Sequence, residues 1–130
     1  MGLAAQRLIQ QLKDVSLPMR EQEIAEICGK SVPYEVDWDS FEGDTDALNF
    51  VDNLSCHRLN MALRDICSDD LGRAAVCAGL HVVRLSRARD AGDMHLRFEE
   101  GVLDMRCAYQ LRTDGMFDEG QIHAALMQKL

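Results

Sequence analysis

The spacing of apolar side chains changes at residue 80, and this change constrains the fold more than any other feature of the chain. From there to residue 110, apolar and polar side chains alternate with a period of two, which is typical of β-strands with one buried face. Short polar segments with a glycine, at 90–93 and 99–101, separate the alternating runs and suit hairpin turns. The pattern predicts three consecutive strands, HVVRLSRAR, MHLRFEE and VLDMRCAYQ, paired as an antiparallel meander.

The rest of the chain mostly shows the spacing of amphipathic helices, with apolar residues three and four positions apart. We expect helices over residues 3–15, 19–28, 45–67, 69–78 and 118–129. Pro18 separates the first two because proline cannot continue a regular helix, although the two could also form one kinked element.

A further strand is predicted at residues 31–41, where Val32, Tyr34, Val36 and Trp38 alternate with polar, mostly acidic residues. The order ααβααβββα indicates a single α+β domain over residues 1–130, with a mostly antiparallel sheet of about four strands and helices packed on one face. Such a sheet would leave its other face to solvent or to a partner.

Composition limits the classes of function. The net charge is −8, and residues 1–79 hold 14 acidic against 7 basic side chains, so general binding to a phosphate backbone is not expected. No apolar run approaches the roughly 20 residues that cross a bilayer. Five cysteines without a CxxC pair, and an N-terminus without a continuous apolar block, lead us to expect a reduced, cytoplasmic protein.

The acidic segment 35–46 is the strongest candidate for a site. A calcium loop starting at Asp37 fails, because its fifth position is Phe41 and its twelfth is Leu48. Carboxylates along one exposed strand face have no reason to differ in pKa, as acid–base catalysis requires. We therefore expect the segment to contact a basic protein. The candidate contact residues are Glu35, Asp37, Asp39, Glu42, Asp44 and Asp46.

A second candidate set lies on the polar face of the predicted meander, where His95, Arg97 and Arg106 could hold an anionic ligand. Pairing of these cations with carboxylates on neighbouring strands is the simpler interpretation. No histidine or cysteine pair has the spacing of a zinc site, so we expect no metal, and no motif indicates a cofactor.

These observations favour a non-enzymatic protein-binding module, such as an immunity- or antitoxin-like inhibitor or an adaptor, that binds a basic protein partner. The alternative is a small enzyme or a domain that binds an anionic ligand in a pocket between sheet and helices. The sequence leaves open whether the chain catalyses a reaction, and it leaves open a homodimer formed through a sheet edge or the N-terminal helix.

Overall fold

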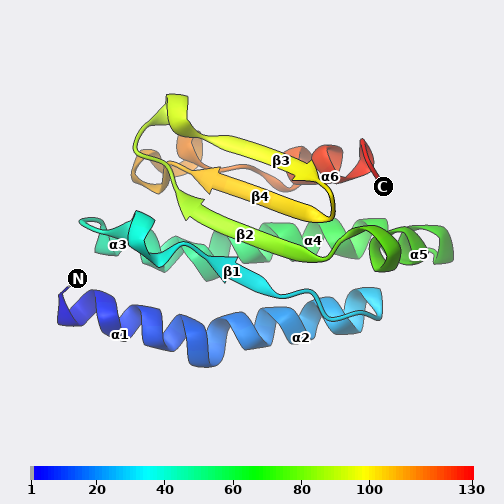
Figure 1. Cartoon of the computed structure of the whole chain (residues 1–130), viewed down its shortest axis with the longest axis horizontal. Coiled ribbons are helices and arrows are strands. Elements are labelled where there is room, and N and C mark those ends of the chain that lie inside the picture. Colours follow the sequence, from blue (N-terminus) through cyan, green and yellow to red (C-terminus); the bar gives the residue numbers. More distant parts are fainter. Residues whose placement is uncertain (1) are drawn as a thin grey trace.

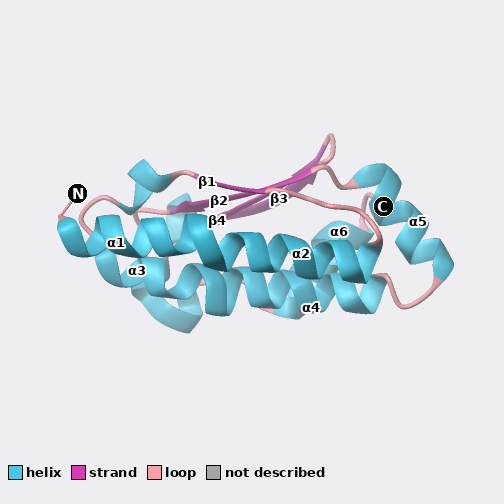
Figure 2. Ribbon diagram, turned by 90° about the horizontal axis from the view of Figure 1, so that it is seen from below, coloured by secondary structure: helices cyan, strands magenta, loops and turns pink. Residues whose placement is uncertain are grey.

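The layer of helices covers one face of the sheet. The structure, a computed structural model, describes residues 2–130. Within these residues, Figures 1 and 2 show a β-sheet packed on a layer of helices. The helices are α1 (Leu3–Gln11), α2 (Leu17–Cys28), α3 (Thr45–Phe50), α4 (His57–Ile66), α5 (Asp70–Gly79) and α6 (Glu119–Met127). The strands are β1 (Tyr34–Val36), β2 (Val82–Arg87), β3 (His95–Glu99) and β4 (Val102–Cys107).

Helix boundaries follow capping chemistry. The side chains of Asp44, Asp69 and Asp118 accept hydrogen bonds from backbone N–H groups in the first turns of α3, α5 and α6. Gly29, with φ of 78°, ends α2 in the left-handed conformation that glycine adopts without strain. The acidic residues near helix starts thus satisfy donors that the helix itself leaves unpaired.

Two π-helical turns join the longer helices end to end. One, at Leu12–Ser16, connects α1 to α2, and the other, at Val51–Cys56, connects α3 to α4. Pro18 lies in the first turn of α2, directly after the widened turn, so the missing N–H of proline does not interrupt the helix. The expected pair of N-terminal helices is therefore one long, locally widened element.

The expectation of a mostly antiparallel sheet is wrong. The strand order is β1-β2-β4-β3, in which β1 and β2 are parallel, β2 and β4 are parallel, and only β3 and β4 are antiparallel. Parallel strands usually have two buried faces and a continuous apolar sequence. Here one face is exposed, so β2 and β4 alternate as antiparallel strands do, and the sequence pattern could not reveal their direction.

The predicted meander is also wrong, because β4 lies between β2 and β3. The segment after β2 contains a short 3₁₀ turn, Ala91–Asp93, and crosses the end of β4 instead of forming a hairpin (Figure 1). The backbone N–H of Ala88 donates to Cys107 O at 2.8 Å, which holds this crossing against β4. Leu103 and Met105 are almost completely buried, which suits the central position that β4 takes.

The first predicted strand is much shorter than residues 31–41. After β1 the chain turns into a 3₁₀ helix, Trp38–Phe41. Phe41 is buried, and its ring lies 6.5 Å from that of Trp38 and 5.7 Å from that of Tyr109. Burial of Phe41 against Tyr109 draws the chain away from the sheet, so Asp39 does not continue the strand face that carries Glu35.

The core lies between the sheet and the helices. Strand residues Val83, Leu85 and Leu103 and helix residues Leu59 and Ile122 are all 1% exposed or less. Apolar side chains fill this layer, so the polar face of the sheet is the side that the described helices leave open. No helix in residues 2–130 is both long and apolar enough to cross a membrane.

Candidate functional site

The open face of the sheet carries charges in register. One row crosses all the strands, with Glu35 paired to Arg84, Arg84 to Asp104, and Asp104 to Arg97. The charges therefore alternate in sign from one edge of the sheet to the other. Only the first pair is closed by an ion pair, Arg84 Nε to Glu35 Oε2 at 3.0 Å, and both of its side chains are more than half exposed. An exposed pair of this kind adds little stability.

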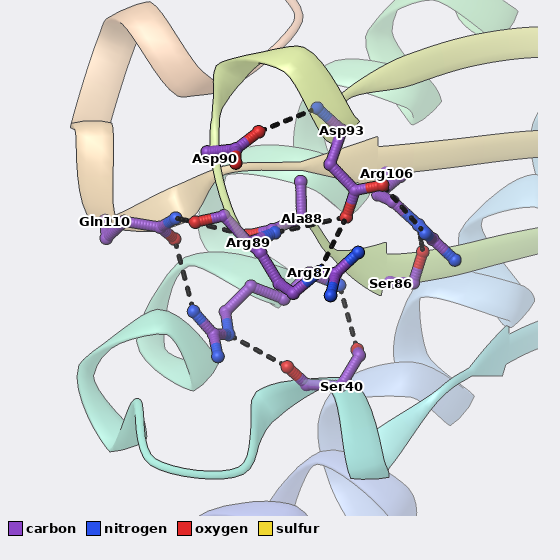
Figure 3. A network of polar contacts seen from close by, with 9 residues as sticks. All are labelled: Ser40, Ser86, Arg87, Ala88, Arg89, Asp90, Asp93, Arg106 and Gln110. Carbon is purple, nitrogen blue, oxygen red and sulfur yellow. Dashed lines mark hydrogen bonds and ion pairs between the residues drawn. The ribbon is translucent and has the colours of Figure 1, made fainter.

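A second row joins Ser86, Arg106 and His95. Arg106 donates through Nε to Ser86 Oγ at 3.1 Å and through a terminal nitrogen to Asp93 at 3.3 Å (Figure 3). The backbone N–H of Arg89, followed by the charge of Arg106, holds the pKa of Asp93 below its usual range. Arg106 is thus fixed by the segment that crosses the end of β4.

His95 has an unusual environment. Its Nε2 atom lies 3.2 Å from a carboxylate oxygen of Asp104, but the geometry does not make a hydrogen bond, and the nitrogen is buried without another partner. A buried polar atom without a hydrogen bond is uncommon. The imidazole of His95 and the carboxylate of Asp104 therefore lie in close contact without a hydrogen bond between them.

A hollow of about 300 Å³ opens on this face between β1, β2 and β4. Its charged lining consists of Glu35, Asp37 and Asp104 against Arg84 and Arg106. Arg84 is neutralised by Glu35, and Arg106 is paired with Asp93 outside the hollow.

Two carboxylates of the hollow remain without an Arg or Lys partner. Asp37 has no ion pair within the described residues. Asp104 lies in register between Arg84 and Arg97, but neither guanidinium is within ion-pair distance of it, and its one ion-pair contact among the described residues is His95. A cationic group is the natural occupant of such a hollow.

Arg87 closes the polar network at one end of the sheet. Its Nε donates to Ser40 O at 2.9 Å, a terminal nitrogen donates to Glu42 O at 3.2 Å, and its guanidinium lies 3.6 Å from Asp44 (Figure 3 shows the contact with Ser40). The side chain is only 17% exposed. Arg87 therefore holds residues 40–44 against the end of β2, and we call these contacts of Arg87 with Ser40, Glu42 and Asp44 the clasp.

The six predicted contact residues consequently separate into groups. Glu35 and Asp37 line the hollow. Asp44 caps α3 and meets Arg87, which also binds the backbone of Glu42, so both belong to the clasp. Asp39 and Asp46 are exposed, in the 3₁₀ helix and in the first turn of α3.

The predicted anion-binding residues lie on one face but do not converge. His95 and Arg106 are opposite each other in the register of β3 and β4. His95 lies beside Asp104, and Arg106 forms an ion pair with Asp93. Arg97 is exposed on the edge strand and forms no ion pair within residues 2–130. The sequence pattern predicted that carboxylates on neighbouring strands accompany these cations, and Asp104 is such a neighbour of His95 and Arg97. It did not indicate Asp93, which pairs with Arg106 from the segment that crosses the end of β4.

The described part of the chain contains no group of three or more His, Cys, Asp or Glu side chains placed to hold a metal ion. In the core, polar side chains form hydrogen-bonded pairs, such as Tyr34 Oη to Asn60 Oδ1 at 2.6 Å and Ser55 Oγ with Tyr109 Oη at 2.6 Å. Burial raises the pKa of both tyrosines well above the usual range. These pairs satisfy core groups and lie away from the open face.

Comparison with known proteins finds no matching family model, no similar curated protein and no similar solved structure. The functional interpretation therefore depends on the geometry of this chain alone.

Proposed function

We propose that the chain is a non-enzymatic protein-binding module that receives a basic side chain of its partner in the hollow on the open face. The observation that carries this proposal is the pair of carboxylates, Asp37 and Asp104, that line the hollow without an Arg or Lys partner. A Lys or Arg side chain placed between them would gain two opposite charges in a partly desolvated site.

The surrounding residues support recognition by orientation as well as by charge. Arg84 and Arg106 border the hollow. Arg106 is held by Ser86 and Asp93, and Arg84 makes an exposed ion pair with Glu35. Side chains that are already ordered lose little conformational entropy when a partner binds. The two Arg side chains at the rim can also pair with carboxylates of the partner, which would set its orientation.

The overall charge favours the same class of partner. A net charge of −8 attracts a basic protein at long range and raises the rate of association at low salt. An inhibitor or adaptor for a basic protein fits this description. Asp39 and Asp46, which are exposed near the same end of the sheet, would extend the acidic border of the interface.

The alternative, a domain for anionic ligands, receives less support from the charges. A second hollow of about 350 Å³ contains Arg84 and Arg97, but also Glu99, Glu100 and Asp104. Carboxylates outnumber guanidinium groups in both hollows. An anion would therefore approach a surface of its own sign.

The test is capture of the partner from the cells that make this protein, with the full chain immobilised at low salt. The variant Asp37→Asn/Asp104→Asn should lose the partner. The control variant Asp14→Asn/Glu26→Gln removes the same charge from the outer surface beside α2, where both side chains are exposed, and should keep it. Equal recovery by the two variants would contradict the proposal. Measurement of the mass in solution separates a homodimer from a complex with another protein.

A further inference from the structure

Three cysteines that are distant in the sequence meet where the ends of three helices converge. Cys28 is the last residue of α2, Cys67 follows the last residue of α4, and Cys77 lies in α5. The Cys67 thiol donates to Cys28 Sγ with the sulfur atoms 3.0 Å apart, and the Cys77 thiol donates to Cys28 O at 3.1 Å. All three are free thiols.

The Cys28–Cys67 pair needs little movement to form a disulfide. A disulfide bond is about 2.05 Å long, so the sulfur atoms must approach by about 1 Å. Each cysteine terminates its helix, and a helix end adjusts more easily than a helix interior. The remaining cysteines, Cys56 and Cys107, are buried and have no thiol partner within the described residues.

Access to solvent differs among the three thiols. Cys28 and Cys67 are buried, whereas Cys77 is partly exposed. Burial also raises the pKa of the Cys28 and Cys67 thiols, so both react slowly with a dissolved disulfide. Their attack is favoured only on a sulfur already held beside them within the protein, where proximity offsets the small thiolate fraction. A reagent from solvent therefore meets Cys77 first.

We propose that Cys28 and Cys67 form a reversible redox pair, which small-molecule disulfides of the glutathione type oxidise through Cys77. The Cys77 thiolate attacks one sulfur of the small disulfide, forms a mixed disulfide and releases one small thiol. Cys28 then attacks the sulfur of Cys77 and displaces the second small thiol. Cys67 attacks the sulfur of Cys28, which leaves the Cys28–Cys67 disulfide and restores the Cys77 thiol.

The reaction is balanced. Two electrons pass from Cys28 and Cys67 to the small disulfide, and the two protons of their thiols end on the two released small thiols. The product joins the ends of α2 and α4, far along the chain from each other, and removes conformational freedom from the unfolded state. The oxidised chain should therefore unfold at a temperature several degrees higher than the reduced chain.

The test uses the full chain, incubated with oxidised glutathione, quenched with N-ethylmaleimide and digested without reductant. Mass spectrometry should find one crosslinked peptide pair that contains Cys28 and Cys67, with both absent from the alkylated fraction. The variant Cys67→Ala should lose this crosslink and the variant Cys107→Ala should keep it. In Cys77→Ala the crosslink should form at least about 10-fold more slowly.

Peptide mapping of the unsubstituted chain is sufficient to test the Cys28–Cys67 crosslink, so the result does not depend on a variant that fails to fold. A dominant crosslink between other cysteines, or a glutathione adduct that persists at Cys77 without a crosslink, would overturn the redox pair. Full alkylation of Cys28 and Cys67 after unfolding of the oxidised sample would overturn it as well. An unchanged rate in Cys77→Ala would overturn the relay through that residue.

Discussion

Replacement of Arg87 by methionine tests the clasp that orders the acidic segment. Methionine keeps an apolar stem of similar length but removes the donors that bind Ser40 O and Glu42 O. Both carbonyl groups would lose a charged donor, and Asp44 would lose its ion pair at 3.6 Å.

The magnitude follows from the burial of the side chain. A hydrogen bond from a charged group contributes about 1.5–3 kcal/mol. Because Arg87 is 17% exposed and water can partly replace it at the carbonyl groups, we expect the two bonds and the ion pair together to contribute about 3 kcal/mol. For a domain of this size that corresponds to a decrease in Tm of roughly 10 °C.

Urea denaturation followed by tryptophan fluorescence is the assay, because Trp38 lies beside the clasped segment. With a denaturant slope of about 2 kcal/mol/M, the midpoint should fall by about 1.5 M. The matched control is Arg84→Ala, whose ion pair with Glu35 is more than half exposed and should change the free energy of unfolding by less than about 0.5 kcal/mol. Equal, small shifts in both variants would show that the clasp does not stabilise the fold.

Two further predictions concern a turn and a titrating group. Gly101 has φ of 81°, and a Cβ added there would clash with the His81 ring, whereas Gly43 has φ of 82° and open space around it. Gly101→Ala should therefore lower the free energy of unfolding by about 1 kcal/mol more than Gly43→Ala does. Equal losses in the two variants would contradict the clash. Burial alone would raise the pKa of Glu23, but hydrogen bonds from Asn60 and then Arg20 hold this pKa below its usual range. The stability from this lowered pKa is complete above the unfolded value, near 4.3, and is lost as the pH falls through the folded value. Acid unfolding of Glu23→Gln should therefore depend less on pH below about 4.5 than that of the wild type, and identical pH dependence would refute the assignment.

Local features of the fold were predictable from the sequence because they depend on local chemistry. The helices began close to Asp44, Asp69 and Asp118, whose side chains cap them. The alternation along 94–99 and 102–107 placed the apolar and polar faces of β3 and β4 correctly.

Pairing order was not predictable, because alternation records which face is buried and not which strand is the neighbour. The segment 90–93 has the composition of a hairpin turn, and Asp90 caps a local 3₁₀ turn there. Asp93, however, binds the side chain of Arg106, a contact that exists only after β4 has inserted. The partner of a strand is a tertiary property of this kind.

The candidate site was predictable only in part for the same reason. Glu35 and Asp37 could be chosen from the acidic segment, and Arg106 from the polar face of its strand. Asp104 becomes their neighbour only through the parallel pairing of β2 with β4, which brings strands far apart in the sequence into register. No local pattern indicates this juxtaposition.

Titration with a short lysine-rich peptide, followed by NMR of the backbone amides, tests the central claim most directly, because it needs no knowledge of the natural partner. We predict salt-sensitive shifts centred on Glu35, Asp37 and Asp104, absent with a glutamate-rich peptide and strongly reduced in Asp37→Asn/Asp104→Asn. Shifts centred instead on the acidic outer surface around Asp14 and Glu26, or shifts unaffected by the double substitution, would contradict the assignment of the hollow as the site for a basic side chain.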